Sequence, residues 1–340
     1  MTHPDLAMVI PVWFEEAVPE DIIRDRLLRT LTCVEHYVLP GKVVFAVDGD
    51  GRSAEILHSL RPEFERRGGS FRLVIREENG GKGAALAAGL RALLRKESFS
   101  YAMVRDGDGD HYVGDIEHLY RYMQWMRAQG VEGEIIVAGR RVDVHRSIGW
   151  IRGEFEALLN RLILAALTHR LAAEDRVLDL RFLSAYAEPP DFMSGYKLYS
   201  AGICRMMAEN DWQAVLPSSA ADLYRYGMEQ FPLVEGVLAG AAVGEVLRLA
   251  GDDRKVSGHG GYTEPSVNAG LALWVLRRLD ISAEAAVSMT ENATARSRLH
   301  TDPVGVPLLE SFCEVLYQGL RKYWREPVPR KPRPVRLGLL

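Results

Sequence analysis

Hydrophobic and polar positions in the first third of the chain alternate between two patterns. Short runs rich in β-branched and aromatic residues predict buried strands at residues 6–13, 42–48 and 71–78, and a fourth strand with its exit loop at 101–110. Segments with helical spacing of apolar residues lie between them, at residues 21–37, 53–67 and 81–96. Strands that alternate with helices are typical of βαβ units. The pattern therefore predicts an α/β fold with a mostly parallel central sheet flanked by helices.

Four polar residues follow the predicted strands of this sheet. They are Glu15, Asp48, Lys82 and Asp106. In open parallel sheets, ligands bind outside the carboxyl ends of the strands. We therefore expect these four side chains to lie along one rim of the molecule.

The second half of the chain follows a different pattern. A strand is predicted at residues 134–142 and a late one at 242–250, and a long amphipathic helix at 149–170 lies between them. Two more helices are predicted at 266–279 and 308–324, before a proline-rich basic tail. Because proline fixes φ and lacks an amide donor, we expect the tail to be extended and mobile. The predicted organisation is a main domain over residues 1–262, a helical extension over 263–325 and a tail over 326–340.

Composition narrows the functional classes. The 340 residues carry a formal net charge of −4, which gives no overall reason to bind nucleic acid. Cys33, Cys204 and Cys313 are far apart and odd in number, which argues against a disulfide framework or structural zinc and favours a reducing cytoplasm. The N-terminus lacks the features of a signal peptide, and the apolar run at 162–167 is too short to span a bilayer. We expect a cytoplasmic protein without a transmembrane segment; peripheral attachment to a membrane is the alternative.

The stretch "RDGDGDH" at residues 105–111 is the densest acidic motif. Asp106 and Asp108 could both reach one Mg²⁺ or Mn²⁺ ion, since such ions prefer oxygen ligands and commonly bridge carboxylates to substrate phosphates. Asp110 and His111 are further candidates. A calcium EF-hand is excluded because His111 stands where that loop requires glycine and because a strand precedes the acids. A solvated Asp-Gly turn remains the alternative.

A glycine-rich segment at residues 76–90 gives the second signal. Its glycines allow close approach of a ligand, and the following helix directs its positive end toward an anion. Lys82 adds a positive charge, although the pattern is not a P-loop. Asp48, at the end of the second predicted strand, could accept hydrogen bonds from a ribose or a base. A flexible loop and an Asp-Gly turn are the alternatives for these two motifs.

Five stretches, in this order, resemble motifs of family 2 glycosyltransferases. "VIPVWFEE" resembles their opening strand, "AVDGDG" their second acidic strand end, and "NGGKGAALAAGL" their glycine-lysine-glycine loop and helix. "VRDGDGDHYVGDI" resembles their DxD loop, and "DFMSGYKLYSAGI" is similar to a segment of the polyprenyl-phosphate sugar transferases. The resemblance covers about residues 6–260. It implies a GT-A fold that binds a nucleoside diphosphate sugar and, usually, a divalent metal.

The resemblance also implies roles for individual positions. Those that would face the nucleotide sugar are Pro11, Val12, Glu15, Asp48, Lys82, Asp106 and Gly107. Asp108 would bind the metal, and Ser194, Gly195 and Tyr196 would lie near the transferred sugar and the acceptor. The nucleotide-sugar half would span about residues 1–115 and the acceptor half about 116–262. The chain departs from the family pattern at Phe14, Gly49 and Val113, which leaves the identity of the base open.

A glycine-rich loop at residues 251–262 carries further candidates. Arg254 and Lys255 could neutralise a leaving diphosphate, and the imidazole of His259 is a common type of metal ligand. The loop resembles both the basic loop of the polyprenyl-phosphate branch and the metal-binding histidine loop of mannosylglycerate-synthase-like enzymes. An unconstrained surface loop is the alternative.

An inverting transfer needs a general base close to the acceptor hydroxyl, and a carboxylate is the usual choice. The candidates are Asp191, Asp222 and Glu229. Asp222 precedes a helix-like run, so it could instead cap that run. A retaining enzyme of the same fold need not use such a base, and the sequence does not distinguish inverting from retaining transfer.

These observations favour a metal-dependent glycosyltransferase that uses Mg²⁺ or Mn²⁺. It would transfer a hexose from a UDP- or GDP-linked sugar to a small polar acceptor, and a homodimer is compatible with the sequence. One alternative is a polyprenyl-phosphate sugar transferase at the membrane surface. Others are a sugar-phosphate nucleotidyltransferase, although the glycine-rich loop expected after the first strand is lacking, and a non-catalytic module that binds nucleotide sugars.

Overall fold

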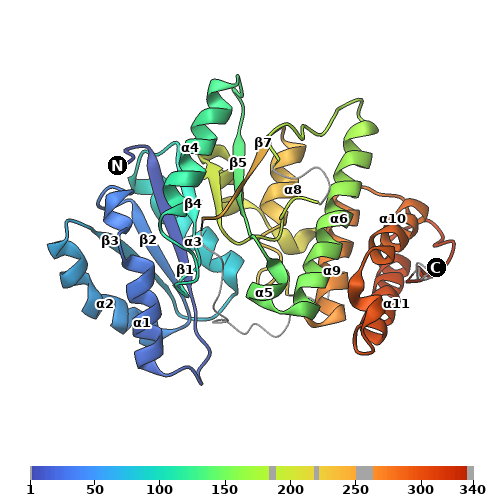
Figure 1. Cartoon of the computed structure of the whole chain (residues 1–340), viewed down its shortest axis with the longest axis horizontal. Coiled ribbons are helices and arrows are strands. Elements are labelled where there is room, and N and C mark those ends of the chain that lie inside the picture. Colours follow the sequence, from blue (N-terminus) through green and yellow to red (C-terminus); the bar gives the residue numbers. More distant parts are fainter. Residues whose placement is uncertain (1, 184–188, 218–221, 250–262, 335–340) are drawn as a thin grey trace.

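The computed structural model of the chain describes residues 2–183, 189–217, 222–249 and 263–334. Within these ranges a seven-stranded sheet runs through the molecule in the order β3-β2-β1-β4-β6-β5-β7 (Figure 1). The strands are β1 (Leu6–Val12), β2 (Val43–Asp48), β3 (Phe71–Arg76), β4 (Tyr101–Val104), β5 (Ile135–Arg140), β6 (Lys197–Ser200) and β7 (Ala242–Leu247).

Helices cover both faces of the sheet. In the first half they are α1 (Glu20–Leu31), α2 (Gly51–Arg66), α3 (Lys82–Lys96) and α4 (Asp115–Ala128). The second half holds α5 (Val144–Ile148), α6 (Trp150–Ala172), α7 (Ala201–Glu209), α8 (Phe231–Leu238), α9 (Pro265–Arg278), α10 (Ala283–Ala295) and α11 (Gly305–Tyr323). Short 3₁₀ helices in the described part of the chain are η1 (Val34–His36), η2 (Trp212–Val215) and η4 (Arg298–Thr301). The prediction of an α/β fold is confirmed.

The sheet is mostly parallel, as predicted, but one strand runs the other way. β1, β2, β3 and β4 pair in parallel, as do β5 and β7, whereas β6 is antiparallel to both β4 and β5. The sequence analysis did not predict β6 as a strand. It is only four residues long and includes the buried Lys197, so it lacks the apolar run that marks the other strands.

Strand β1 shows how the two cores form. All seven of its residues are buried. Successive side chains point to opposite faces of a strand, so Ala7 and Val9 join the core that contains α3 and α6. Met8 and Ile10 join the second core, against α1, α2 and α4. A continuous apolar run is therefore what a strand covered on both faces requires.

The first helix is shorter than the sequence pattern suggested. The prediction extended it to Tyr37, but α1 ends at Leu31. Cys33 adopts a left-handed conformation with φ of 63°, and a separate 3₁₀ turn follows at Val34–His36. A left-handed residue interrupts the helical path although the apolar spacing continues.

The C-terminal helices share a core with the main domain. α9 and α11 contribute buried residues to the same cluster as α6, and the red end of the chain in Figure 1 lies beside α6. α10 was not predicted from the sequence. None of the helices in the described ranges is both long and apolar enough to cross a membrane.

The described part of the proline-rich tail is pinned to these helices. Arg330 pairs with Glu291 of α10 at 2.5 Å, and Lys331 pairs with Glu314 of α11. The tail was predicted to be extended and mobile. Up to residue 334 it forms neither helix nor strand, and these ion pairs hold it against α10 and α11, an arrangement that its composition does not reveal.

Candidate functional site

A cleft opens at the carboxyl ends of the strands, where the sequence placed its polar rim. Its lining includes Asn79 after β3 and Arg152 at the start of α6, and it encloses about 1070 Å³, including space open to solvent. Nine of the predicted site residues line it: Pro11, Val12, Glu15, Asp48, Lys82, Asp106, Gly107, Asp108 and Glu229. The other lining residues are Trp13, Phe14, Val18, Asn79, Gly81, Ala85, Arg152 and Arg225.

Lys82 connects two carboxylates in the centre of the cleft. Its Nζ lies 2.8 Å from Oδ1 of Asp106 and 2.8 Å from Oε1 of Glu229. Burial alone would raise the pKa of Glu229, but the Lys82 ammonium outweighs it and holds that pKa at about 2. Glu229 is therefore an ionised partner of Lys82 at neutral pH.

The backbone before Lys82 explains the glycine at position 81. Gly81 has φ of 86°, and a Cβ there would meet the backbone nitrogen of Arg225 at 2.7 Å. Only glycine adopts this conformation without strain while another chain segment approaches so closely. The close approach brings the segment that carries Arg225 and Glu229 against the start of α3.

The acidic loop after β4 is fixed from inside the protein. Arg105 is 1% exposed and donates to the carbonyl oxygens of His111 and Thr30, which closes the loop from 106 to 111. The Asp106 amide donates to Nδ1 of His111 at 3.2 Å, and the imidazole stacks on Tyr196 at 4.6 Å. Burial, followed by the nearby Arg248, lowers the pKa of His111 well below its usual range. His111 is therefore a neutral structural residue of this loop.

The residues of the cleft fit a divalent cation held together with a substrate. Asp106 and Asp108 both present carboxylates to the cleft, but no group of three His, Cys, Asp or Glu side chains suited to a metal occurs among the described residues. Five acidic side chains line the cleft against three basic ones. A cleft with this excess of negative charge would bind a diphosphate only with additional positive charge, and Mg²⁺ is usually bound through one or two carboxylates plus substrate phosphates.

Asp48, at the end of β2, also lines the cleft. Its Oδ1 accepts from Nη1 of Arg76 at 2.9 Å and from the amide of Gly80 at 3.2 Å. Burial raises the pKa of Asp48, and these donors oppose the shift. Beside it, the Arg225 guanidinium lies 6.0 Å from the ring centre of Trp13. This part of the cleft therefore combines an aromatic ring with polar groups, as a site for a planar base would.

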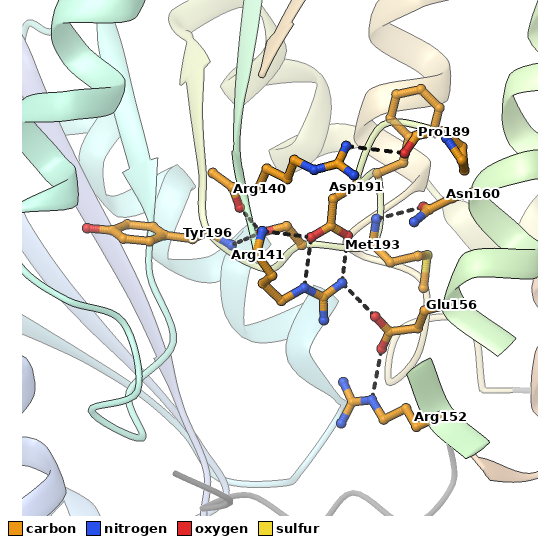
Figure 2. A network of polar contacts seen from close by, with 12 residues as sticks. Arg140, Arg141, Arg152, Glu156, Asn160, Pro189, Asp191, Met193 and Tyr196 are labelled. Carbon is orange, nitrogen blue, oxygen red and sulfur yellow. Dashed lines mark hydrogen bonds and ion pairs between the residues drawn. The ribbon is translucent and has the colours of Figure 1, made fainter. Parts of the chain in front are cut away.

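Asp191 does not line the cleft, although it was predicted as a catalytic base. It is 3% exposed and binds Arg141 through two bonds, Nε to Oδ2 at 2.8 Å and Nη2 to Oδ1 at 2.6 Å (Figure 2). Burial would raise the pKa of Asp191, but Arg141 outweighs it and lowers the value to about 2. A carboxylate held in this way is a poor proton acceptor at neutral pH.

The three predicted acceptor residues lie behind the cleft wall. Ser194 is fully buried and donates to the carbonyl of Gly139 at 2.6 Å, and Tyr196 is fully buried against His111. Neither lines the cleft. Gly195 comes nearest, because a Cβ there would meet Oδ2 of Asp106 at 2.8 Å and Nζ of Lys82 at 3.2 Å.

Asp222 also lies outside the cleft lining. Its Oδ1 accepts from the amides of Tyr224 and Arg225, at 3.1 and 3.0 Å, and its side chain is 47% exposed. Asp222 therefore closes a turn and does not cap a helix, which was the alternative given by the sequence, because the next helix begins only at Phe231. Arg254, Lys255 and His259 lie outside the described residues.

Sequence reasoning missed several residues of the site. Trp13, Arg225 and Arg152 also line the cleft. Trp13 directly follows Val12, a predicted contact, so the opening strand motif could have identified it. Arg152 stood inside an amphipathic helix pattern, where an arginine is normally solvated. Nothing in its local sequence separates it from the other arginines of α6.

The comparisons with known proteins bear on the family. The sequence model of glycosyl transferase family 2 matches residues 8–167. No curated protein matches the chain significantly. Among solved structures, CMP:2-keto-3-deoxy-manno-octonic acid synthetase complexed with CTP is 14% identical, with a TM-score of 0.37 over 72% of this chain and 90% of that one. A proposed glucose-1-phosphate thymidylyltransferase from Bacillus anthracis, in complex with a sucrose, is 13% identical, with a TM-score of 0.36 over 79% and 95%.

The family match covers the part of the chain that builds most of the cleft. It runs from β1 into α6 and contains Asp48, Lys82, Asp106, Asp108 and Arg152. The two solved structures are too distant to inform the reaction. The mixed sheet with helices on both faces is an α/β GT-A fold, and the family supports a function of the glycosyltransferase kind. The match over residues 8–167 supports the assignment of this chain to glycosyl transferase family 2.

Proposed function

We propose that this protein is a metal-dependent hexosyltransferase that uses a nucleoside diphosphate sugar and a small polar acceptor. The observation that carries the proposal is the composition of the cleft, where Asp106 and Asp108 face the same space as Asp48, Lys82 and Arg152. The cleft combines carboxylates that could bind a cation, cationic groups that could bind phosphates, and an aromatic and polar region that could bind a nucleotide base. A nucleotide sugar has the length and the charges to engage all of them.

Different parts of the cleft have separate roles in this proposal. The base lies near Asp48 and Trp13, and the diphosphate lies near Asp106, Asp108 and Lys82. A bound Mg²⁺ or Mn²⁺ would neutralise charge on the departing nucleoside diphosphate, with Asp108 as a ligand. Lys82 holds Asp106 and Glu229 in place, at 2.8 Å from each. The sugar and the acceptor then lie toward β6 and β5, on the side of Arg152.

The proposal assigns no general base among the three predicted carboxylates. Asp191 and Glu229 both have a pKa of about 2 and a cationic partner. Asp222 is outside the cleft lining. An efficient base has a pKa close to the working pH. In the proposal these carboxylates therefore stabilise the structure or bind substrate. Analysis of the product determines whether the transfer inverts or retains configuration.

Nucleotide binding tests the proposal directly. We expect UDP or GDP and its hexose conjugates to stabilise the protein in a thermal-shift assay with Mn²⁺ and to lose this effect in EDTA. Asp108→Asn should reduce metal-dependent nucleotide affinity at least a hundredfold. The matched control is Asp25→Asn, which removes the same charge from α1, where Asp25 is 53% exposed and paired with Arg29.

Turnover tests the reaction class. Incubation with a UDP- or GDP-hexose and candidate polar acceptors should give a glycosylated product by mass spectrometry. A polyprenyl phosphate in detergent serves as the competing acceptor. Release of pyrophosphate from a nucleoside triphosphate and a sugar phosphate would instead show a nucleotidyltransferase. The absence of both turnover and metal-dependent nucleotide binding would overturn the proposal.

A further inference from the structure

A chain of ion pairs joins the buried Asp191 to Arg152 in the cleft (Figure 2). Asp191 binds Arg141 through two hydrogen bonds, and Nη2 of Arg141 also donates to Oε2 of Glu156 at 2.7 Å. The second oxygen of Glu156, Oε1, accepts from Nε of Arg152 at 2.8 Å. Each carboxylate oxygen of Glu156 therefore holds a different arginine.

Burial changes along this chain. The side chains of Asp191, Arg141 and Glu156 are 4%, 7% and 1% exposed, whereas that of Arg152 is 22% exposed. Of the four residues, only Arg152 lines the cleft. The three buried members thus have no direct access to a substrate, and the fourth does.

The charges within the chain balance. Two carboxylates face two guanidinium groups, which is the condition under which ionised groups remain stable in a protein interior. Burial would lower the pKa of Arg141, but Asp191 and Glu156 outweigh it and raise that pKa well above its usual range. Asp191 and Arg141 are therefore ionised at neutral pH, and Glu156 has a fixed position between the two arginines.

A guanidinium group is planar, so a bond to Nε fixes the plane in which the remaining N–H groups lie. Glu156 makes that bond to Arg152. In addition, Arg152 and Glu156 stand four residues apart on α6, so the helix backbone sets the distance between them. The result is an arginine whose orientation is set before any substrate binds.

We propose that Asp191, Arg141 and Glu156 are positioning residues that fix Arg152 to receive an anionic group of the substrate. The proposal rests on the proposed function, because it places that substrate in the cleft. Arg152 lines the same cleft as Asp106 and Asp108, so the anionic oxygens belong either to the donor diphosphate or to an acidic acceptor. In this arrangement Asp191 acts through Arg141 and Glu156.

Calorimetric titration of anions tests the proposal without turnover. The probes for a donor diphosphate are UDP, GDP and inorganic pyrophosphate, each with Mg²⁺. The probes for an acidic acceptor are inorganic phosphate and glycerate, added to protein already saturated with nucleotide. We expect Arg152→Ala to lower the affinity for the probes of at least one of these two groups tenfold or more. The affected group identifies the source of the anion, and an unchanged affinity for all probes would overturn the proposal.

The positioning role has its own readout. Glu156→Gln should lower the affinity for the same probe at least threefold in the wild-type background, because one of the two arginines then loses its carboxylate oxygen. In an Arg152→Ala background the same change should have no further effect, since there is no Arg152 left to orient. An equal loss in both backgrounds, or a gain in affinity, would show that Glu156 does not act through Arg152.

A second variant keeps the test open if Glu156→Gln does not fold. Arg152→Lys retains the charge but not the planar fork, so it should recover less than a fifth of the lost affinity. Full recovery would show that a point charge is sufficient and would overturn the positioning role. The matched control is Arg170→Ala, which removes a partly exposed arginine from the same helix, where it pairs with Glu174 and Asp280.

These outcomes separate the inference from the proposed function. If no nucleotide sugar is turned over but pyrophosphate affinity still depends on Arg152 and Glu156, the reaction class is wrong and the positioning role stands. If hexose transfer is found while every anion binds equally well to Arg152→Ala, the proposed function stands and the positioning role is wrong.

Discussion

Two groups of charged side chains in this molecule differ in their charge balance and in their exposure to solvent. The cleft cluster consists of Lys82, Asp106, Asp108 and Glu229, and the buried network consists of Asp191, Arg141 and Glu156 with Arg152 at its outer end. In the cleft cluster three carboxylates face one lysine, whose side chain is 21% exposed. The buried network has two carboxylates and two arginines, and three of these side chains are at most 7% exposed.

The difference shows how one set of residue types serves two purposes. An excess of carboxylates remains stable only where water solvates them or a cation neutralises them, so the cleft cluster is suited to a ligand. A balanced network needs no ligand and fixes the geometry around it. Glu229 and Asp191 illustrate this contrast, because both have a pKa of about 2 while only Glu229 lines the cleft.

The largest effect that separates the two groups is expected from Arg141→Ala. It leaves two buried carboxylates without their main cation, and breaking such a buried pair costs about 3–5 kcal/mol of unfolding free energy. Urea denaturation followed by circular dichroism measures this change. Arg170→Ala should stay within about 0.5 kcal/mol, and a loss below about 1 kcal/mol for Arg141→Ala would contradict a structural role for the network.

Acid should weaken the buried network over a defined range. The pKa of Asp191 is lowered from 3.8 in the unfolded chain to about 2 in the folded protein. A depressed pKa contributes stability that is complete above the unfolded value and is lost as the pH falls through the folded one. The stability gap between wild type and Asp191→Asn should therefore narrow by about 2 kcal/mol between pH 5 and pH 2. Denaturant titrations across this range measure the gap, and a constant gap would contradict the depressed pKa.

Gly195→Ala should disturb the cleft cluster alone. The added methyl group would meet Asp106 and Lys82 at 2.8 and 3.2 Å and would displace them. We expect nucleotide affinity in Mg²⁺ to fall about tenfold, or about 1.4 kcal/mol, with a smaller change in unfolding free energy. Gly133→Ala is the matched control, since its nearest atom is 3.8 Å away. Equal affinity in the two variants would show that the Asp106–Lys82 contact is irrelevant to nucleotide binding.

The smallest effect is expected from Asp222→Asn. The exposed carboxylate caps a turn and belongs to neither group, so kcat/KM should change less than threefold and stability by at most about 1 kcal/mol. Initial rates with a nucleotide hexose measure the first quantity. A hundredfold loss of kcat with an unchanged melting temperature would restore Asp222 as a base and would remove the contrast with Glu229.

The sequence was informative where chemistry follows directly from a strand. Glu15, Asp48, Asp106 and Asp108 each follow an apolar run, and the parallel pairing of β1, β2 and β4 brings these ends together. The periodicity of apolar residues and the order of the predicted strands and helices can both be read from the sequence. These residues could therefore be identified as a rim. Lys82, at the start of α3, followed from the same reasoning.

Sequence reasoning failed where a role depends on residues that are distant along the chain. Asp191 and Arg141 are 50 positions apart, and nothing in either local stretch indicates the bond between them. Asp191 was therefore assigned to catalysis on its motif alone. Arg152 was overlooked because helical spacing describes only which face of α6 is buried, and the cleft that receives its side chain is formed by other elements.

The sequence by itself indicated the α/β architecture, the resemblance to glycosyl transferase family 2 and the acidic rim of this protein, because apolar periodicity and motif order can be read without knowledge of contacts. Only the tertiary structure decided which carboxylates face the cleft and which are neutralised inside. That distinction depends on burial and on the nearest opposite charge. Both are set by packing between β5, β6 and α6, segments that the chain brings together only when it folds.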